Sequence, residues 1–186
     1  MAIFEKVSKY KDQEIEMPCR KTAESAGYDM VAAEDTVVPS IWLLMSDMEK
    51  NIVNKIEDDE CISLEQIAML TKALNAKPTL VSTGMKCKLD PGTFLQLSVR
   101  SSCPLKHWIM MANSVGIIDA DYYNNESNEG EIFFQLYNLS PFNIIIHKGE
   151  AIGQGIILPY LTTENDIASG IRIGGFGSTS DPGGEI

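Results

Sequence analysis

Arginine, histidine and cysteine are scarce in this chain of 186 residues. It has two histidines and four cysteines, and no two cysteines are spaced as Cys-x-x-Cys. A zinc site is therefore not expected, because structural zinc ligands come mainly from such clusters. The chain has 15 basic residues against 26 acidic ones, a net charge of −11. Proteins that grip the nucleic-acid backbone normally present a basic face, so direct nucleic-acid binding is not predicted.

Long apolar runs are also missing. No stretch of about 18 apolar residues occurs, so a membrane-spanning helix is not predicted. The beginning of the chain, Met1–Lys6, lacks the apolar core of a secretion signal. We therefore expect a cytoplasmic protein whose cysteines are reduced thiols.

The second half of the chain has the pattern of short strands separated by turns. Apolar and polar residues alternate over residues 81–89, a period of two that is typical of a strand. Asp90-Pro91-Gly92 then favours a turn. Further extended segments are expected at residues 93–99, 132–139, 143–147 and 151–158. Strands at this spacing predict one all-β domain, a barrel or a sandwich.

One segment breaks this pattern. Apolar residues recur every three or four positions over residues 41–56, and Ser63 with Gln66 forms a capping box for a second helix. We interpret residues 40–77 as a helical insertion in the β domain. Residues 34–65 hold nine acidic and two basic residues, so much of the negative charge lies here. The helices either pad the core or bind a partner protein.

Two of the three arginines lie beside serine or glycine clusters. Arg100 precedes Ser101 and Ser102 at the end of a predicted strand, and Arg172 precedes a glycine-rich tail at residues 174–184. Guanidinium groups, hydroxyls and exposed backbone N–H groups all bind phosphate oxygens. Either segment alone is also typical of an ordinary surface loop.

A single aspartate is placed where it could act as a base. The apolar pair Ile117–Ile118 brings Asp119 to the end of a predicted strand, and a carboxylate there can accept a proton from water. Tyr122 follows within one turn and could pack on a sugar or a base. On spacing alone, a turn aspartate with a core tyrosine fits equally well.

Five segments in chain order, taken together, resemble the motifs of the trimeric dUTP diphosphatases (dUTPases). The segments are residues 26–29, 100–102, 113–122, 149–155 and 172–180. The most specific are Gly-Ile-Ile-Asp-Ala-Asp-Tyr at 116–122 and Gly-Phe-Gly-Ser-Thr at 175–179. Where the segments vary, they resemble dUTPases of Gram-positive bacteria and their phages.

The resemblance implies a fold and an activity. The fold would be a distorted jelly-roll β domain over residues 1–173, with a flexible tail at 174–186 that closes over the active site. The protein would form a homotrimer whose active sites are shared between subunits. It would hydrolyse dUTP with Mg²⁺ to dUMP and pyrophosphate, which keeps uracil out of DNA and supplies dUMP for dTMP synthesis.

The resemblance also implies roles for single residues. Asp119 would activate the attacking water. Tyr122 would pack on the deoxyribose and leave no room for a 2′-hydroxyl. Asp29 would act through waters of the Mg²⁺ shell or orient its neighbours. Uracil contacts are implied for Asn113, Ile117, Ile118 and Phe176, and phosphate contacts for Arg100, Ser101, Ser102, Gln154, Arg172, Ser178 and Thr179. Substrate binding without a more specific role is implied for Gly116, Phe133 and Gly177.

The chain also departs from the family pattern, and two alternatives stay open. The family motif runs Tyr, a basic residue, Gly, Glu, whereas residues 122–131 are longer, with extra residues expected at the tip of the uracil hairpin. A dCTP deaminase shares the fold and the Arg-Ser-Ser stretch, but it carries a second arginine where Pro104, Leu105 and Lys106 stand here. The second alternative is a regulatory dUTPase that binds a protein partner through residues 40–77.

Overall fold

The computed structural model describes residues 1–44, 63, 77–170 and 172, and these form an almost entirely β structure. Within them the strands are β1 (Ile3–Lys6), β2 (Tyr28–Val31), β3 (Thr36–Val38), β4 (Thr79–Ser82), β5 (Met85–Lys88), β6 (Thr93–Val99), β7 (Ile109–Met111), β8 (Gly116–Asp119), β9 (Phe133–Asn138), β10 (Ile144–Ile146) and β11 (Ala151–Pro159). Two short α-helices, α1 (Ile41–Leu44) and α4 (Ser102–His107), and two 3₁₀ turns, η1 (Ser8–Tyr10) and η2 (Ala120–Tyr122), lie between them.

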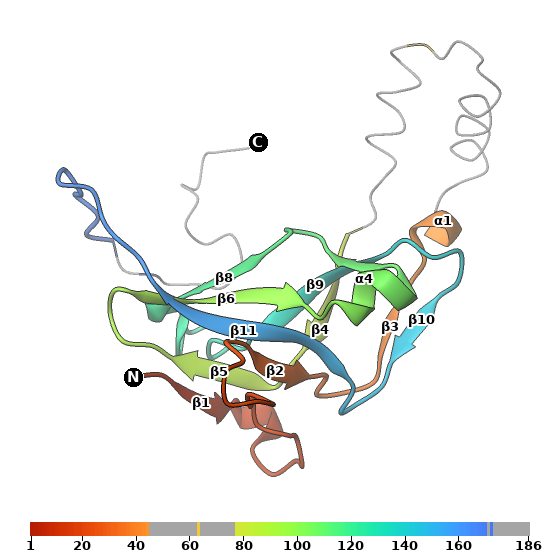
Figure 1. Ribbon diagram of the computed structural model, residues 1–186, viewed down its shortest axis with the longest axis horizontal. Coiled ribbons are helices and arrows are strands. Elements are labelled where there is room, and N and C mark those ends of the chain that lie inside the picture. The colour runs from red at the N-terminus through yellow and green to blue at the C-terminus, as the bar shows by residue number, and fades with distance from the viewer. Residues whose placement is uncertain (45–62, 64–76, 171, 173–186) are drawn as a thin grey trace.

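The strands pair antiparallel in four small sheets. The largest has the order β2-β11-β6-β8, a second has the order β4-β9-β7, and β1-β5 and β10-β3 form two-stranded ribbons. The long strand β11 runs across the molecule between β2 and β6 (Figure 1). The all-β fold predicted from the spacing of turns is therefore confirmed.

The strand expected over residues 81–89 is interrupted. The chain turns at Gly84, whose φ of +66° favours glycine, and separates β4 from β5. The Ser82 hydroxyl accepts a hydrogen bond from the Gly84 N–H at 3.1 Å and stabilises this turn. The single-strand prediction was wrong because residues on both sides of the turn stay extended, so the alternation continues through it.

The other strand predictions in the second half agree closely with the structure. Strand β6 has the expected bounds, and β9, β10 and β11 begin and end within one residue of the predicted segments. Along β9 every second side chain, from Phe134 to Asn138, is buried. The buried Asn138 amide donates to the carbonyls of Val38 and Phe142, at 3.0 and 2.7 Å, so it joins β9 to β3 and to the loop before β10.

The predicted insertion at residues 40–77 lies largely outside the described residues. Its first turn is α1, at Ile41–Leu44. In the described part of the chain, no helix is long and apolar enough to cross a membrane. The three described cysteines, Cys19, Cys87 and Cys103, are free thiols.

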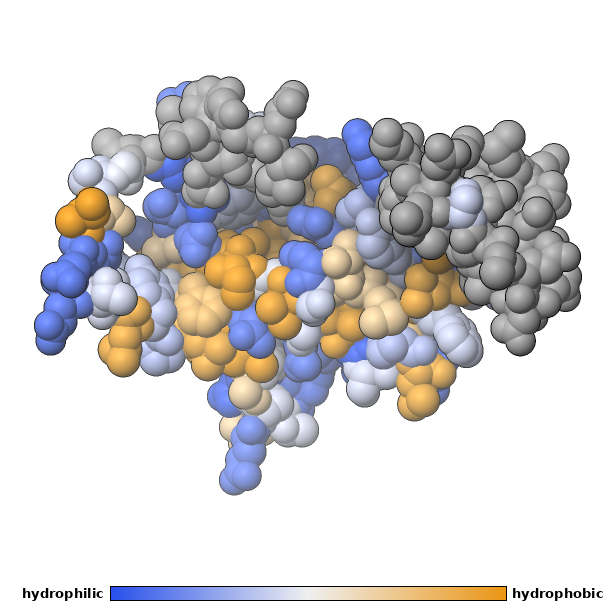
Figure 2. All heavy atoms as spheres, turned by 90° about the horizontal axis from the view of Figure 1, so that it is seen from above, coloured by the Kyte–Doolittle hydropathy of each residue, from blue (hydrophilic) through white to orange (hydrophobic). Residues whose placement is uncertain are grey.

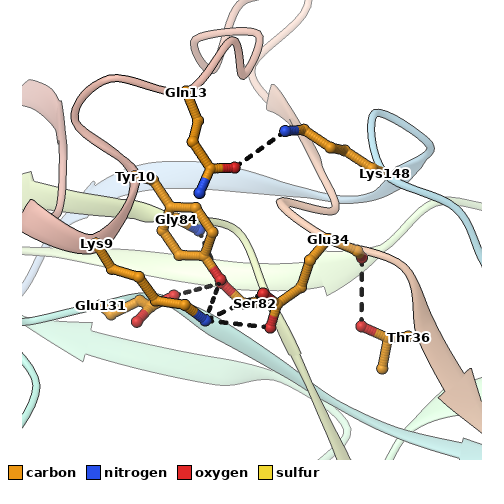
Figure 3. Close-up of polar contacts among 9 residues, drawn as sticks. All are labelled: Lys9, Tyr10, Gln13, Glu34, Thr36, Ser82, Gly84, Glu131 and Lys148. Atoms are coloured by element: carbon orange, nitrogen blue, oxygen red, sulfur yellow. Dashed lines mark hydrogen bonds and ion pairs between the residues drawn. The ribbon is translucent and has the colours of Figure 1, made fainter.

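A small polar cluster closes the N-terminal end of the fold. The Tyr10 hydroxyl is buried and accepts a hydrogen bond from Lys9 Nζ at 2.7 Å, and a hydrogen bond of 3.2 Å joins it to Ser82 Oγ. The Ser82 hydroxyl also hydrogen-bonds the buried carboxyl group of Glu131, and Lys9 reaches Glu34 (Figure 3). Burial is the main reason that the pKa of Glu131 is raised.

Glu131→Gln should change how stability depends on pH. A carboxyl group with a raised pKa binds more protons in the folded state, so its contribution to stability falls as pH rises above the unfolded pKa of about 4.5. Urea unfolding should therefore show the variant gaining stability relative to wild type as pH rises above about 4.5, until the folded-state carboxyl group has lost its proton. The exposed Glu126→Gln is the control, and a Glu131 difference that is constant with pH would contradict this prediction.

Candidate active site

The first group of predicted site residues gathers around Arg100. In the large sheet, Asp29 of β2 lies opposite Gln154 of β11, and Gln154 lies opposite Ser98 of β6. Arg100 follows directly after β6, and its Nη2 lies 3.9 Å from Asp29 Oδ2. Gly27 leaves room for the glutamine, because a Cβ there would lie only 2.2 Å from Gln154 Oε1.

The serines complete this group. Ser101 is the N-cap of α4 and Ser102 is its first residue, and the Cys103 N–H donates to the Arg100 carbonyl at 2.9 Å. We call Asp29, Arg100, Ser101, Ser102 and Gln154 the Arg100 cluster. The Arg100 side chain is 44% exposed, so its N–H groups stay accessible to a ligand. Such donors suit phosphate oxygens.

A second group gathers around Asp119, and we call Asp119, Asp121, Tyr122 and Arg172 the Asp119 cluster. Asp119 is the last residue of β8, and η2 then brings Asp121 and Tyr122 beside it. Arg172 donates through Nη2 to Asp119 Oδ2 at 2.5 Å and through Nε to Asp121 Oδ1 at 2.9 Å. Its guanidinium carbon lies 5.7 Å from the centre of the Tyr122 ring.

The two aspartates face open space. A hollow of about 500 Å³ is lined by Leu89, Pro91, Asp119, Ala120, Asp121 and Tyr160. The Asp119 side chain is 50% exposed, whereas Arg172 is only 12% exposed. A carboxylate in this position can meet both water and a ligand in the hollow once Arg172 releases it.

The two clusters lie at opposite ends and edges of the same sheet. Asp119 is opposite Phe94, whereas Arg100 lies six positions further along β6, which at about 3.3 Å per residue is about 20 Å away. Arg100 also reaches toward β2, which is three strand spacings, about 14 Å, from β8. One copy of the chain therefore does not bring both clusters to the same phosphate group.

Comparisons with known proteins assign this chain to a family. The dUTPase family model matches residues 65–180. The deoxyuridine 5′-triphosphate nucleotidohydrolase of Lactococcus lactis is 35% identical over 178 residues, which is 95% of each chain. The chain belongs to the dUTPase family. The corresponding Rickettsia typhi protein is 31% identical and covers 96% of this chain and 99% of its own length.

Solved dUTPase structures agree with this assignment. The Streptococcus mutans dUTPase is 32% identical, with a TM-score of 0.65 over 87% of this chain and 98% of its own. The dUTPase of phage phi11 of S. aureus shares the fold, with a TM-score of 0.59 over 92% of this chain and 98% of its own at 16% identity. The jelly-roll-like fold and the hydrolysis of dUTP implied by the motif resemblance are confirmed. These relatives give no support to the dCTP deaminase alternative.

The segment expected to read uracil in this dUTPase is the turn between β7 and β8. Asn113 is exposed in that turn, and Gly116 is buried where a Cβ would lie 3.2 Å from Leu97. Ile117 is 50% exposed while Ile118 is buried in the core, as alternation along a strand requires. Because β8 is the last strand of its sheet, the outer backbone edge at Ile117 pairs with no other strand among the described residues.

Phe133 is not part of this turn. It begins β9, opposite Ser82, in the β4-β9-β7 sheet, which holds the strand before the turn but not β8. Phe176, Gly177, Ser178 and Thr179 lie outside the described residues. The roles assigned to these five residues stay predictions.

The extra residues after Tyr122 do not lengthen a hairpin at the site. They form a loop, residues 123–131, that packs against the N-terminal segment. The Tyr123 hydroxyl donates to Glu5 at 2.6 Å, and the Ser8 N–H and hydroxyl bind Glu129 at 3.1 and 2.9 Å. The expected position at a hairpin tip was wrong, because the chain turns away from the sheet at η2 directly after β8.

Sequence reasoning also missed Asp121. Its carboxylate shares Arg172 with Asp119, and the two acidic residues are only two positions apart in the sequence. The Asp-x-Asp spacing was the available signal. This spacing was not informative alone. It places two side chains on the same face only if the strand continues, whereas here the chain leaves the strand after Asp119 and Asp121 lies in η2.

Proposed function

We propose that this dUTPase binds dUTP between two copies of the chain in a homotrimer, with Mg²⁺ on the phosphates. The main observation in support of this proposal is that the Arg100 cluster and the Asp119 cluster lie far apart within one chain. The motif resemblance assigns both to one nucleotide, yet one chain holds them at opposite edges of a sheet. Bringing the Arg100 cluster of one copy to the Asp119 cluster of the next resolves this conflict.

The surface near β8 supports contact with a second copy. Apolar side chains in and next to β7 and β8 are exposed, namely Trp108 at 64%, Met110 at 48%, Val115 at 43% and Ile117 at 50%. Figure 2, seen from the side on which β8 lies in Figure 1, shows hydrophobic surface gathered near the middle of that face. Exposed apolar surface of this kind is typical of an interaction site.

In the proposed reaction Asp119 accepts a proton from the attacking water. The water oxygen forms a bond to phosphorus, the anhydride bond between the α- and β-phosphates breaks, and pyrophosphate leaves. In the free chain Arg172 is paired with Asp119 Oδ2, so in this proposal it leaves the carboxylate when substrate binds. The γ-phosphate offers a competing anion for Arg172, so substrate binding itself would release the base.

The same movement would open the sugar site. Arg172 covers one face of the Tyr122 ring. When Arg172 turns to the phosphates, that face becomes available to pack on the deoxyribose. Asn113 and the backbone at Ile117 would then meet the uracil edge, and the tail at residues 174–186, with Phe176, Gly177, Ser178 and Thr179, would close over the bound nucleotide.

The residues of the Arg100 cluster fit a magnesium ion that arrives with the substrate. Among the described residues, no three carboxylate, histidine or cysteine side chains form a metal cage. Mg²⁺ usually keeps several waters and takes phosphate oxygens, so a cage is not needed. Asp29, paired with Arg100, is the carboxylate that would accept hydrogen bonds from these waters. Bound Mg²⁺ would neutralise phosphate charge. The phage phi11 dUTPase coordinates a structural Mg(II) ion.

A regulatory role for residues 40–77 stays a prediction, as does a cytoplasmic location. Phage dUTPases, represented by that of Staphylococcus bacteriophage 80alpha, control transfer of virulence genes by a G protein-like mechanism. The 80alpha protein is 17% identical to this chain, with a TM-score of 0.58 over 92% of this chain and 97% of its own. The likeness therefore shows a shared fold only. Whether residues 40–77 bind a partner protein needs a direct binding experiment.

Pyrophosphate release tests the proposed function. We expect rapid release from dUTP with Mg²⁺, release from UTP, dCTP and dTTP that is slower by at least about 10²-fold, and loss of activity with a chelator. Ammonia release from dCTP would instead indicate a deaminase. Equal rates with dUTP and UTP would contradict the proposed role of Tyr122.

A further inference from the structure

The hydroxyl group of Tyr122 is held at two points by the loop that follows it. It donates to the Glu131 carbonyl at 3.0 Å and accepts a hydrogen bond from Asn128 Nδ2 at 2.7 Å. The residue is only 4% exposed. Both partners belong to the longer loop at residues 123–131, so this clamp comes from the part of the chain that departs from the family pattern.

A network of asparagine side chains shapes the loop around Tyr122. The buried Asn125 amide donates to the Tyr122 carbonyl at 2.9 Å and to Asn128 Oδ1 at 2.7 Å. The same Asn128 oxygen accepts a hydrogen bond from the Gly130 N–H at 3.1 Å. Asn125 Oδ1 in turn accepts hydrogen bonds from the Ser127 N–H and hydroxyl, at 3.0 and 2.7 Å. Asn128 is therefore fixed by its oxygen and points its nitrogen at the tyrosine hydroxyl.

The backbone of the loop is tight as well. Asn124 and Glu129 have φ of 58° and 60°, and Gly130 has φ of 79°. A Cβ at Gly130 would lie 2.6 Å from the Tyr122 carbonyl oxygen, so only glycine allows this close approach. The loop thus closes directly onto the backbone that carries the tyrosine.

The outer side of the loop is anchored to the body of the protein. Lys86 of β5 donates to Asn124 Oδ1 at 2.6 Å, and Ser8 holds Glu129. At its end, the Glu131 carboxyl group is buried against Ser82 and Tyr10 (Figure 3). Because the loop itself is bound to the rest of the protein, its two hydrogen bonds to the Tyr122 hydroxyl hold the ring in one position.

We infer that Asn128 is a positioning residue that sets the preference of this enzyme for deoxyribose over ribose. The inference rests on the proposed packing of Tyr122 against the sugar. A ring excludes a 2′-hydroxyl only if it does not move aside, and a displacement of about 1 Å already weakens such exclusion. Asn128, together with the Glu131 carbonyl, removes that freedom by fixing the far end of the ring.

The ratio of kcat/KM for dUTP to that for UTP tests this inference. Asn128→Ala should lower the ratio by about five- to tenfold, mainly by raising kcat/KM for UTP. Asn128→Asp keeps an oxygen for Gly130 and Asn125 but replaces the N–H donor by an acceptor, so the Tyr122 hydroxyl can bind either the new carboxylate or the Glu131 carbonyl and loses one of its two contacts. This variant should lower the ratio less than Asn128→Ala does. Ser127→Ala, which touches Asn125 but not Tyr122, is the matched control and should leave the ratio unchanged.

A double-mutant cycle shows whether Asn128 acts through the tyrosine. In a Tyr122→Phe background the hydroxyl is gone, so Asn128→Asp should have no further effect on the ratio. An unchanged ratio in both Asn128 variants, or equal effects in the two backgrounds, would overturn the inference. Tyr122→Leu distinguishes failure of the proposed function from failure of this inference. If Tyr122→Leu leaves the ratio unchanged, the proposed role of Tyr122 fails. If Tyr122→Leu lowers the ratio but the Asn128 variants leave it unchanged, only the inference about Asn128 fails.

Discussion

Asp119→Asn should lower kcat for dUTP by about 10²- to 10⁴-fold, the usual contribution of a general base. Asparagine has nearly the same shape but does not accept the proton from the attacking water. The carboxylate stands half exposed on the wall of the hollow, with Arg172 as its charged partner. Substrate binding should change little, because the phosphates are expected to contact the Arg100 cluster.

Single-turnover rates and the Kd for dUTP measure these two effects separately. Asp121→Asn is the matched control, since Asp121 also binds Arg172 and faces the same hollow. It should reduce kcat much less than Asp119→Asn does. A kcat near the wild-type value in Asp119→Asn would show that another group takes the proton.

Local patterns in the sequence were enough to predict β6, β9, β10 and β11, whereas the short strand β7 was not predicted. Strand β6, for example, is bounded by turn residues on one side and by Arg100 on the other, and apolar and polar residues alternate from Leu95 to Val99. The turn at Gly84 escaped prediction because a period of two continues on both sides of it. Periodicity reports which faces are buried, and it does not report a change in chain direction.

The pairing of side chains from distant segments could not be predicted from the sequence. Arg172 is 53 positions from Asp119 in the chain, and no local pattern indicates that it covers that carboxylate. The separation of Arg100 from Asp119 also depends on strand order, because β11 and β6 stand between β2 and β8. The motif resemblance assigns these residues to one substrate, whereas the strand order separates them within one chain, and no local sequence pattern indicates that separation.

Mixed oligomers should recover activity that each parent variant lacks. Arg100→Ala removes the guanidinium group expected to bind the phosphates, and Asp119→Asn removes the base. In a trimer with one active site at each interface, every assembly that contains both kinds of chain has one interface where an intact Asp119 meets an intact Arg100. Mixed trimers should therefore have about one third of wild-type activity, whatever their composition.

Co-expression of the two variants with different affinity tags, followed by purification on both tags, isolates these mixed assemblies. Each variant co-expressed with itself under both tags gives the inactive reference, and wild type with both tags gives the full rate. Steady-state pyrophosphate release near one third of that rate is the predicted result. Release no higher than in the inactive references would contradict a site shared between copies and would require Asp119 and Arg100 to work within one chain.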